Sequence, residues 1–463
     1  MADFLKKVVT QKKKEVKTAK SLRPLGTFSK KLRKSTRNFR KALKRKGRVA
    51  LIAEIKKSSP SAGKIIDRFN FNELVSAYDK YADAISVLTD RKFFNGSLGL
   101  MRKVSGKTRP PVLRKDFIID EYQIYEARLY GADAVLLIAN ILTEKQINDF
   151  IRVADSFNMD CIVEVDSAAG LKKALSTRAD IIGINNRNLS TLRIDIGRFE
   201  RIAKKIPKKK LKRLVVVAES GYDSRQDIEG LTGRADAVLV GTAISGAPSH
   251  RTKLRALKGE TLVKICGVTN VKDALNAVRL GTDFIGMNFY SKSPRHVNAA
   301  IAGKISGAVH GKAVVVGVFV NEPAANVKII ARKCGLDCLQ FSGDESPSYV
   351  KQFKLPIIKA IHVEGRKSIA KANSYNANYL MFDAPHTGEY GGTGKMFRHG
   401  LLSGIGNARP FFVAGGLTSE NVGMVVKKLG PFAVDVASGV EERPGKKSYK
   451  KMKQFISEVR RQR

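Results

Sequence analysis

The sequence contains no tryptophan and only four cysteines in 463 residues. Four cysteines in a chain of this length do not form a disulfide framework, which indicates a reducing compartment. The longest apolar runs, such as residues 313–320, reach about half of the ~20 residues that a membrane-spanning helix needs. The N-terminus also lacks the apolar region of a signal peptide. We therefore exclude a disulfide-rich secreted protein and a membrane-spanning protein, and we expect a cytoplasmic chain.

Acidic residues are scarce relative to basic ones. The chain has 42 Asp and Glu against 85 Lys and Arg, a net charge of +43, and residues 1–48, 201–213 and 443–463 alone carry +17, +8 and +8. Such an excess points first to nucleic acid or an anionic surface. However, no aromatic or Arg-Gly pattern is interleaved with the basic runs. The sequence favours solvated faces over a nucleic-acid site, and a nucleic-acid-binding barrel is the alternative class.

Short runs of apolar, β-branched residues recur sixteen times along the chain. Each run is nearly continuous and about four to eight residues long, which is typical of parallel strands covered on both faces. Segments with helical spacing separate the runs, such as 270–280, where Asn270 is a candidate N-cap and Gly281 a candidate stop. The predicted strands are 49–57, 84–90, 112–117, 134–139, 161–166, 181–186, 214–220 and 237–243, then 261–267, 284–290, 314–320, 338–343, 357–363, 379–385, 411–416 and 433–439.

Strands that alternate with helices predict βαβ units and a parallel sheet. Two sets of eight predict an α/β fold of two tandem (β/α)8 TIM barrels, and a doubly wound sheet, which commonly has fewer strands, is the alternative. We place the domains at residues 1–255, with an amphipathic N-terminal helix that starts near residues 4–9, and at 256–463. Because functional groups in such barrels lie at the C-terminal ends of strands, the polar residues that close each run are the candidates.

The first set of strands carries charged residues where a packed strand would have apolar ones. Burial of an unpaired charge is costly, so these residues indicate a functional site, and a structural ion-pair network is the alternative. Strands seven and eight end in Ser-Gly and Gly-Thr, which lets backbone N–H groups reach an anion and predicts a phosphate site. The candidates are Glu54, Lys56, Lys115, Glu164, Asn185, Arg187, Glu219, Ser220, Gly221, Gly241 and Thr242.

The motifs A-E-I-K-K-S-S-P-S, V-L-R-K-D-F-I-I-D, G-I-N-N-R-N-L and V-A-E-S-G resemble those of indole-3-glycerol phosphate synthase, over essentially all of residues 1–255. The resemblance implies closure of the indole ring of 1-(2-carboxyphenylamino)-1-deoxyribulose 5-phosphate, with loss of CO₂ and water. It implies Lys115 as general acid and Glu164 as base or proton partner, and it implies that Glu54 assists dehydration. Lys56 would hold the substrate carboxylate. Further substrate contacts would come from Ser59, Phe94, Asn185, Arg187, Glu219, Ser220, Gly221, Gly241 and Thr242. The residues alone leave open which acid serves which proton step.

The second set of strands has a different group of polar ends. Cys266 directly precedes Gly267 at the end of the first strand, and Asp383 ends the sixth. A lone cysteine on a strand is usually a small core residue, but its place at a strand end favours a site. Glycines after strands seven and eight repeat the pattern of a phosphate site. The candidates are Cys266, Asp383, Gly391, Gly392, Gly415, Gly416, Asp435, Ser438 and Gly439.

The motifs K-I-C-G-V-T-N, S-P-R, F-D-A-P-H-T-G-E-Y-G-G-T-G-K and V-D-V-A-S-G-V-E resemble phosphoribosylanthranilate isomerase, from about residue 261 onward. The resemblance implies an Amadori rearrangement of N-(5-phosphoribosyl)anthranilate, which needs one acid, one base and no cofactor. Asp383 would open the ribose ring as the acid, and Cys266 would be a thiolate base with Lys264 as a candidate source of positive charge. Arg295 would pair with the anthranilate carboxylate. Cys266 argues against a related isomerase that uses two aspartates.

The second half departs from the family pattern in two places. Ser342 stands where the family often has the His of Q-L-H-G-D-E, and Arg398 and His399 stand where it often reads Asp-Trp. The proposed acid and base are intact, so we expect both barrels to be active, and a chain with only the N-terminal barrel active is the alternative. We expect phosphorylated, anthranilate-derived substrates, no metal, no cofactor and a monomer.

Overall fold

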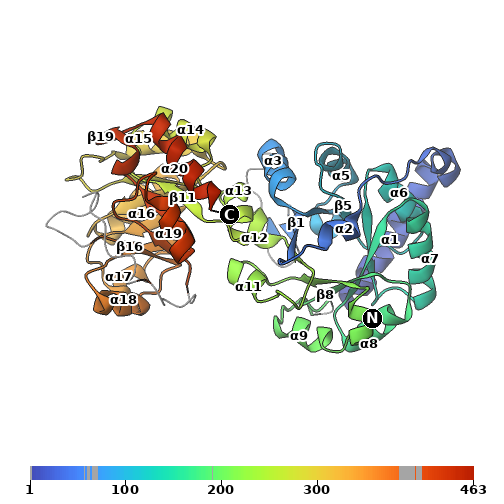
Figure 1. Ribbon diagram of the computed structural model, residues 1–463. Coiled ribbons are helices and arrows are strands. Elements are labelled where there is room, and N and C mark those ends of the chain that lie inside the picture. The colour runs from blue at the N-terminus through green and yellow to red at the C-terminus, as the bar shows by residue number, and fades with distance from the viewer. Residues whose placement is uncertain are drawn as a thin grey trace. The chain divides into compact units, whose positions relative to one another are not determined.

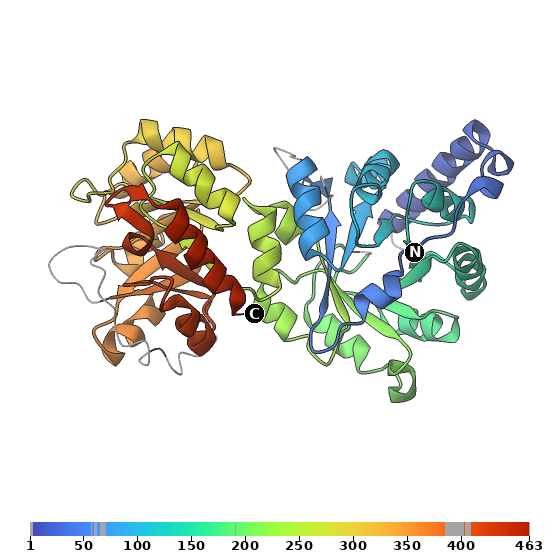
Figure 2. The ribbon, with the colours of Figure 1, turned by 45° about the horizontal axis from the view of Figure 1, so that its top comes forward.

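The computed structural model describes residues 3–56, 58–59, 63–64, 71–189, 191–384, 402 and 409–462. The chain divides into two compact units, Met1–Ala247 and Pro248–Arg463. In each unit, helices surround a closed barrel of parallel strands (Figures 1 and 2). The prediction of two tandem (β/α)8 barrels is confirmed, and the doubly wound alternative is wrong. The predicted domain boundary between residues 255 and 256 stays a prediction.

The first barrel closes in the order β1-β10-β9-β8-β7-β6-β5-β4, with every pair parallel. All eight predicted strands are present. Each ends one to three residues before its predicted C-terminal end, because the polar residues that close each run leave the sheet and enter the loops. The strands are β1 (Ala50–Ile55), β4 (Ala84–Leu88), β5 (Val112–Lys115), β6 (Ala134–Ile138), β7 (Asp160–Val165), β8 (Ile181–Asn185), β9 (Val215–Glu219) and β10 (Ala237–Val240).

Several helices of this unit bury one apolar stripe. In α7 (Glu144–Ser156), a capping box formed by Thr143 and Gln146 starts the helix, and the residues at 147, 150, 151 and 154 are buried at helical spacing. A short hairpin, β2 (Ser58–Ser59) and β3 (Gly63–Lys64), follows β1. The other helices are α2 (Phe39–Leu43), α3 (Phe71–Tyr81), α4 (Arg91–Phe94), α5 (Leu98–Ser105), α6 (Tyr122–Leu129), α8 (Ala168–Ser176), α9 (Gly197–Ala203), α10 (Lys208–Leu211), α11 (Arg225–Glu229) and α12 (Thr242–Ser245).

An additional helix, α1 (Asp3–Leu22), precedes the eight units, as the apolar residues near the N-terminus predict. Leu5, Val8 and Val16 are buried on one face of it. Lys12 lies on the same face and is only 3% exposed. The expectation that the basic N-terminal run forms a solvated face is therefore wrong for Lys12.

The second barrel closes in chain order, β11 to β18, again with every pair parallel. Its strands are β11 (Leu262–Ile265), β12 (Phe284–Asn288), β13 (Val314–Phe319), β14 (Cys338–Phe341), β15 (Ile357–His362), β16 (Tyr379–Asp383), β17 (Phe411–Val413) and β18 (Ala433–Val436). Helix α14 (Val271–Leu280) begins and ends as predicted: the Asn270 side chain accepts a hydrogen bond from the Asp273 N–H, and Gly281 has φ of 100°.

The C-terminal helix α20 (Tyr449–Arg461) packs beside α14 and α19 (Val422–Leu429) of the same barrel (Figure 2). A hairpin of β19 (Glu441–Arg443) and β20 (Lys446–Lys447) lies between β18 and α20. Among the helices of the described residues, none is long and apolar enough to cross a membrane. The remaining helices are α13 (His250–Leu257), α15 (Ala299–Val309), α16 (Ala324–Cys334), α17 (Pro347–Val350) and α18 (Arg366–Lys371).

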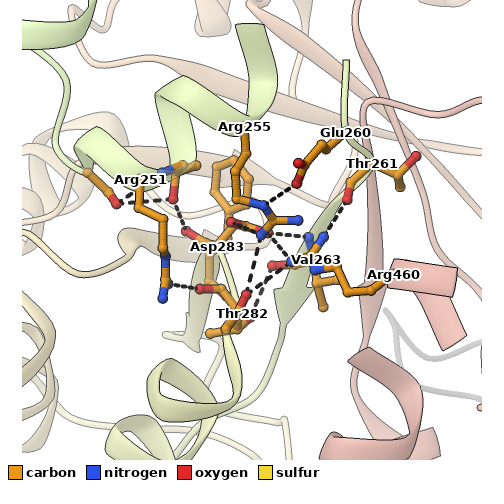
Figure 3. Close-up of polar contacts among 12 residues, drawn as sticks. Arg251, Arg255, Glu260, Thr261, Val263, Thr282, Asp283 and Arg460 are labelled. Carbon is orange, nitrogen blue, oxygen red and sulfur yellow. Dashed lines mark hydrogen bonds and ion pairs between the residues drawn. The ribbon is translucent and has the colours of Figure 1, made fainter. Parts of the chain in front are cut away.

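Helix α13 closes the end of the second barrel where the strands begin (Figure 3). Nη1 of Arg255 lies 2.6 and 2.8 Å from the two carboxylate oxygens of Asp283, the residue before β12. Nη2 of Arg460, on α20, donates to the same carboxylate at 3.0 Å, as does the N–H of Val263 at 2.9 Å. Burial raises the pKa of Asp283 although Arg255 and Arg251 oppose the rise. The base of this barrel is therefore held by a buried carboxylate with cations from two helices.

Replacing Arg255 by methionine is expected to lower the free energy of unfolding of the second barrel by about 3 kcal/mol, because breaking a buried ion pair leaves Asp283 under-compensated. Hydrogen exchange of the amides of β11 and β12 measures the loss, and the amides of β6 and β7 in the first barrel serve as an internal reference. Arg332→Met, on the exposed face of α16, is the matched control. Equal exchange in the two variants would contradict the prediction.

Candidate active sites

The C-terminal ends of the first barrel's strands surround a cavity of about 390 Å³, within the range of small-molecule sites. The sequence predictions placed most of its polar lining correctly at these strand ends. Glu219 lies beside the cavity and contacts Lys115. Ser59 is in β2, but its side chain lies outside the described residues. The predicted residues that line the cavity are Glu54, Lys56, Phe94, Lys115, Glu164, Asn185, Arg187, Ser220, Gly221, Gly241 and Thr242.

Lys115 lies at the centre of the charged groups in this cavity. Its Nζ donates to Oε2 of Glu219 at 2.6 Å and to Oε2 of Glu164 at 3.2 Å. Burial disfavours the ammonium form, but Glu219, Glu164 and Glu54 outweigh burial, and together they raise the pKa of Lys115. The side chain is therefore an ammonium group that can donate a proton to a bound substrate.

The carboxyl groups around Lys115 have opposite protonation preferences. Burial and the neighbouring Glu164 raise the pKa of Glu219 to about 8, despite the opposing effect of Lys115. Burial alone would also raise the pKa of Glu54. That pKa is instead lowered by Lys56, whose Nζ lies 3.0 Å from Oε1 of Glu54, and by Lys115. Glu219 is thus the more readily protonated of the two carboxyls and Glu54 the more readily ionised, which is how one site can supply both an acid and a carboxylate.

Backbone groups after β9 form the part of the cavity suited to an anion. Ser220 and Gly221 have φ of 66° and 87°, so the chain turns sharply at a place where successive N–H groups can form an anion nest. Asn185 fixes the neighbouring loop, because its Oδ1 accepts a hydrogen bond from the Arg187 N–H at 2.9 Å. These contacts are compatible with the predicted phosphate site.

Apart from Phe94, the sequence predictions missed the apolar wall of the cavity. The rings of Phe94 and Phe117 lie 6.2 Å apart, and both residues line the cavity. An apolar residue at a strand end has the same pattern as a core residue, so no sequence signal separates the two. Such a wall suits a flat aromatic ring. The missed lining residues are Phe117, Leu136, Ile138, Leu189, Ile194, Tyr222 and Leu239.

Lys12 of helix α1 is a further charged residue that the sequence predictions missed. Its Nζ lies 2.8 Å from Asp90, which follows β4, and 2.8 Å from Asp116, which directly follows Lys115. Burial would raise the pKa of Asp116, but Arg114 and Lys12 hold that pKa at about 2. The additional N-terminal helix is thus tied by buried ion pairs to the segment that carries Lys115.

A second cavity lies at the C-terminal ends of the strands of the other barrel. Eight of the predicted residues line it, which brings together strands that are far apart in the sequence. The predicted Gly391 and Gly392 lie outside the described residues, as do Arg398 and His399. The predicted lining residues are Cys266, Arg295, Asp383, Gly415, Gly416, Asp435, Ser438 and Gly439.

The electrostatics of this cavity favour the thiol form of Cys266 and raise the pKa of Asp383. Lys264 is fully buried, and its Nζ lies 3.0 Å from Oδ1 of Asp435. Burial and Asp435 raise the pKa of Cys266 although Lys264 opposes the rise, so the unliganded residue is a thiol and not the expected thiolate. Burial also raises the pKa of Asp383, which suits a general acid.

Arg295 is held beside Cys266 by a buried acidic residue. Nε and Nη2 of Arg295 donate to the Glu441 carboxylate at 3.0 and 2.9 Å, and Lys447 contacts the same carboxylate at 2.7 Å. A Cβ at position 267 would lie 2.4 Å from Cδ of Arg295, so Gly267 is what lets the side chain cross the end of β11. The sequence predictions missed Glu441 and Lys447, which lie in the hairpin after β18.

Comparisons with known proteins match a family to each of the two barrels. The family model of indole-3-glycerol phosphate synthase matches residues 5–257, and that of N-(5'-phosphoribosyl)anthranilate isomerase matches residues 263–458. A relative from Vibrio cholerae, described as tryptophan biosynthesis protein TrpCF, is 35% identical over 99% of this chain and 96% of its own length. A relative of the same description from Vibrio parahaemolyticus is 37% identical over 99% and 95%.

Among solved structures, phosphoribosyl anthranilate isomerase from Thermotoga maritima is 37% identical and covers 43% of this chain and 98% of its own, with a TM-score of 0.41. The tandem family matches and the full-length relatives together cover both barrels. The chain therefore belongs to the TrpCF family of tryptophan biosynthesis proteins, in which an indole-3-glycerol phosphate synthase precedes a phosphoribosylanthranilate isomerase.

Proposed function

We propose that the second barrel isomerises N-(5-phosphoribosyl)anthranilate through Asp383 and Cys266, and that the first barrel cyclises the product through Lys115. One observation carries the proposal: each barrel has, at its strand ends, a cavity lined by a half-buried proton donor and by glycines suited to a phosphate. A coupled assay that starts from phosphoribosylanthranilate tests it. Indole-3-glycerol phosphate as the product supports the proposal, and accumulation of either substrate would contradict it.

In the synthase, the ammonium group of Lys115 protonates the substrate carbonyl while the aromatic carbon attacks it. Loss of CO₂ then restores the aromatic ring, and the new hydroxyl leaves as water. Glu54, whose pKa is lowered, supplies a carboxylate that stabilises the cationic intermediate. Glu164 lines the cavity, and its Oε1 has no hydrogen-bond partner among the described residues, so it can accept a proton from the closing ring. Lys56 holds the substrate carboxylate.

In the isomerase, Asp383 donates its proton to the ribose ring oxygen, and the ring opens to an iminium ion. Cys266 then removes the proton from C2' of the iminium, and the resulting enol becomes the ketone. The thiol is the resting form, so the positive iminium beside Sγ and the nearby Lys264 together promote its ionisation when substrate is bound. Arg295 pairs with the anthranilate carboxylate, for which Nη1 remains after Nε and Nη2 bind Glu441.

Replacing Glu441 by glutamine is expected to raise the KM of the isomerase about tenfold and to change kcat by less than about twofold. The neutral amide no longer matches the two donors of Arg295, so the guanidinium that binds the substrate loses its orientation. Steady-state kinetics of the isomerase measure the effect. Glu442→Gln, the exposed neighbour, is the control, and equal KM values for the two variants would argue against this role.

We further propose that the chain acts as a monomer in the cytoplasm. The proposed acid and base of each reaction come together within a single barrel of the chain. The four cysteines are free thiols, as a reducing compartment favours. Light scattering of the purified chain is expected to give one chain per particle.

A further inference from the structure

Asn186 stands in the motif G-I-N-N-R-N-L of the first barrel, directly after β8 and next to Asn185 of the cavity. It is fully buried, and it is not among the described residues that line the cavity. A buried amide is costly unless its donor and its acceptor are both paired. The contacts of Asn186 therefore show which parts of the site this side chain holds in place.

Asn186 hydrogen-bonds two successive peptide groups at the end of β9. Its backbone N–H donates to the carbonyl oxygen of Glu219 at 2.9 Å, and its Nδ2 donates to the carbonyl oxygen of Ser220 at 3.0 Å. In a planar trans peptide, the C=O and the N–H point in opposite directions. Because both carbonyls are turned toward Asn186, the N–H groups of Ser220 and Gly221 point away from it.

These two N–H groups belong to the sharp turn that is suited to an anion. Ser220 and Gly221 have φ of 66° and 87°, and both residues line the cavity. Neither N–H donates a hydrogen bond to another described residue. For Ser220, which is not a glycine, the left-handed conformation costs free energy and persists only where other contacts hold it. The two hydrogen bonds from Asn186 are such contacts.

The other edge of the Asn186 amide fixes the orientation of the side chain. Its Oδ1 accepts a hydrogen bond from the N–H of Phe199 at 2.9 Å, in the first turn of α9. An N–H only donates and a carbonyl oxygen only accepts, so the amide oxygen must face Phe199 and the amide nitrogen must face Ser220. The side chain therefore cannot turn away from Ser220 without also losing its contact with α9.

We propose that Asn186 is a positioning residue of the synthase, which orients the N–H groups of Ser220 and Gly221 toward the phosphate of the substrate. The inference rests on the synthase activity and the phosphate site proposed above. Asn186 acts through the two peptide groups that it holds, so it needs no contact with the substrate. Because a preformed pair of donors spends no binding energy on its own ordering, the benefit goes to binding of the phosphate end.

Asn186→Leu tests the proposal, because leucine has a similar shape but neither a donor nor an acceptor. The inhibition constant of inorganic phosphate, as a competitor of ring closure, is expected to rise about tenfold, with a similar rise in KM. The kcat of ring closure and the inhibition constant of anthranilate, which lacks a phosphate, are expected to change by less than about twofold. A purely structural role for Asn186 would weaken the binding of both competitors.

Asn188→Leu is the matched control, because Asn188 follows the same strand and its Oδ1 accepts a hydrogen bond from the N–H of Thr191, away from the peptide groups of β9. Asn186→Ala replaces Asn186→Leu if the larger side chain disrupts the barrel. An inhibition constant of phosphate at the wild-type value in a folded Asn186 variant overturns the proposal, as does an equal rise in Asn188→Leu.

Failure of the proposed function is distinguishable from failure of this inference. The wild-type chain would then fail to close the indole ring, or inorganic phosphate would not compete with the substrate in the wild-type chain. Either result overturns the proposed synthase or its phosphate site before any variant is compared. Ring closure that phosphate inhibits equally in the wild type and in folded Asn186 variants overturns only the role of Asn186.

Discussion

Lys115→Met is expected to slow indole ring closure by at least about a thousandfold, while the isomerase of the same chain keeps its rate. Lys115 is the half-buried ammonium group that contacts both Glu164 and Glu219, and general acid catalysis contributes roughly 10² to 10⁴ to a rate. Methionine keeps the length of the side chain and removes the proton. Without the ammonium, Glu164 and Glu219 also lose the cation that contacts both of them.

The measurement supplies purified 1-(2-carboxyphenylamino)-1-deoxyribulose 5-phosphate and follows the absorbance of the indole product. Lys103→Met, on the exposed side of α5, controls for the loss of a lysine in the same barrel. Ring closure near the wild-type rate in Lys115→Met would remove Lys115 from the proposed acid role. A parallel fall in isomerase activity would instead indicate general unfolding.

Cys266→Ala is expected to lower isomerase kcat by about a thousandfold or more and to leave ring closure unchanged, because the variant lacks a base for C2'. Cys266→Ser tests whether the thiolate itself is needed. The serine hydroxyl occupies the same place but is a far weaker acid, so it forms little anion. Cys334→Ala, in α16 of the same barrel, is the matched control. Isomerase activity that survives in Cys266→Ala would show that another group takes the proton.

The raised pKa of Cys266 also fixes the direction of the pH dependence. A base works only when deprotonated, so isomerase kcat/KM is expected to rise with pH until the thiol ionises. Because burial raises the pKa of Cys266, this acid limb lies at higher pH than it would for an exposed thiol.

The barrel strands could be predicted because each is a continuous apolar run buried on both faces, as in β13 and β6. The hairpins β2–β3 and β19–β20 could not, since they are two or three residues long and carry no alternation of apolar and polar residues. Helix α14 was predictable to its ends, because Asn270 and Gly281 have the chemistry of caps.

The predicted site residues lie at strand ends, where the barrel geometry itself brings them together. Barrel geometry does not predict which residues reach a site from outside the barrel. Lys12 lies in a run of lysines that predicts a solvated face, and only its spacing from Leu5 and Val8 marks it as buried. Glu441 reaches Arg295 across 146 positions, a pairing that no local pattern indicates.

The cluster at the base of the second barrel also bears on the order in which the chain folds as it is synthesised. Arg255 precedes Asp283 by 28 positions, whereas Arg460 follows Asp283 by 177. A growing chain therefore has one cation for the buried carboxylate before most of the barrel exists, and it gains the second when α20 emerges. Helix α13 thus neutralises the base of the nascent barrel early, and the C-terminal helix completes the closure last.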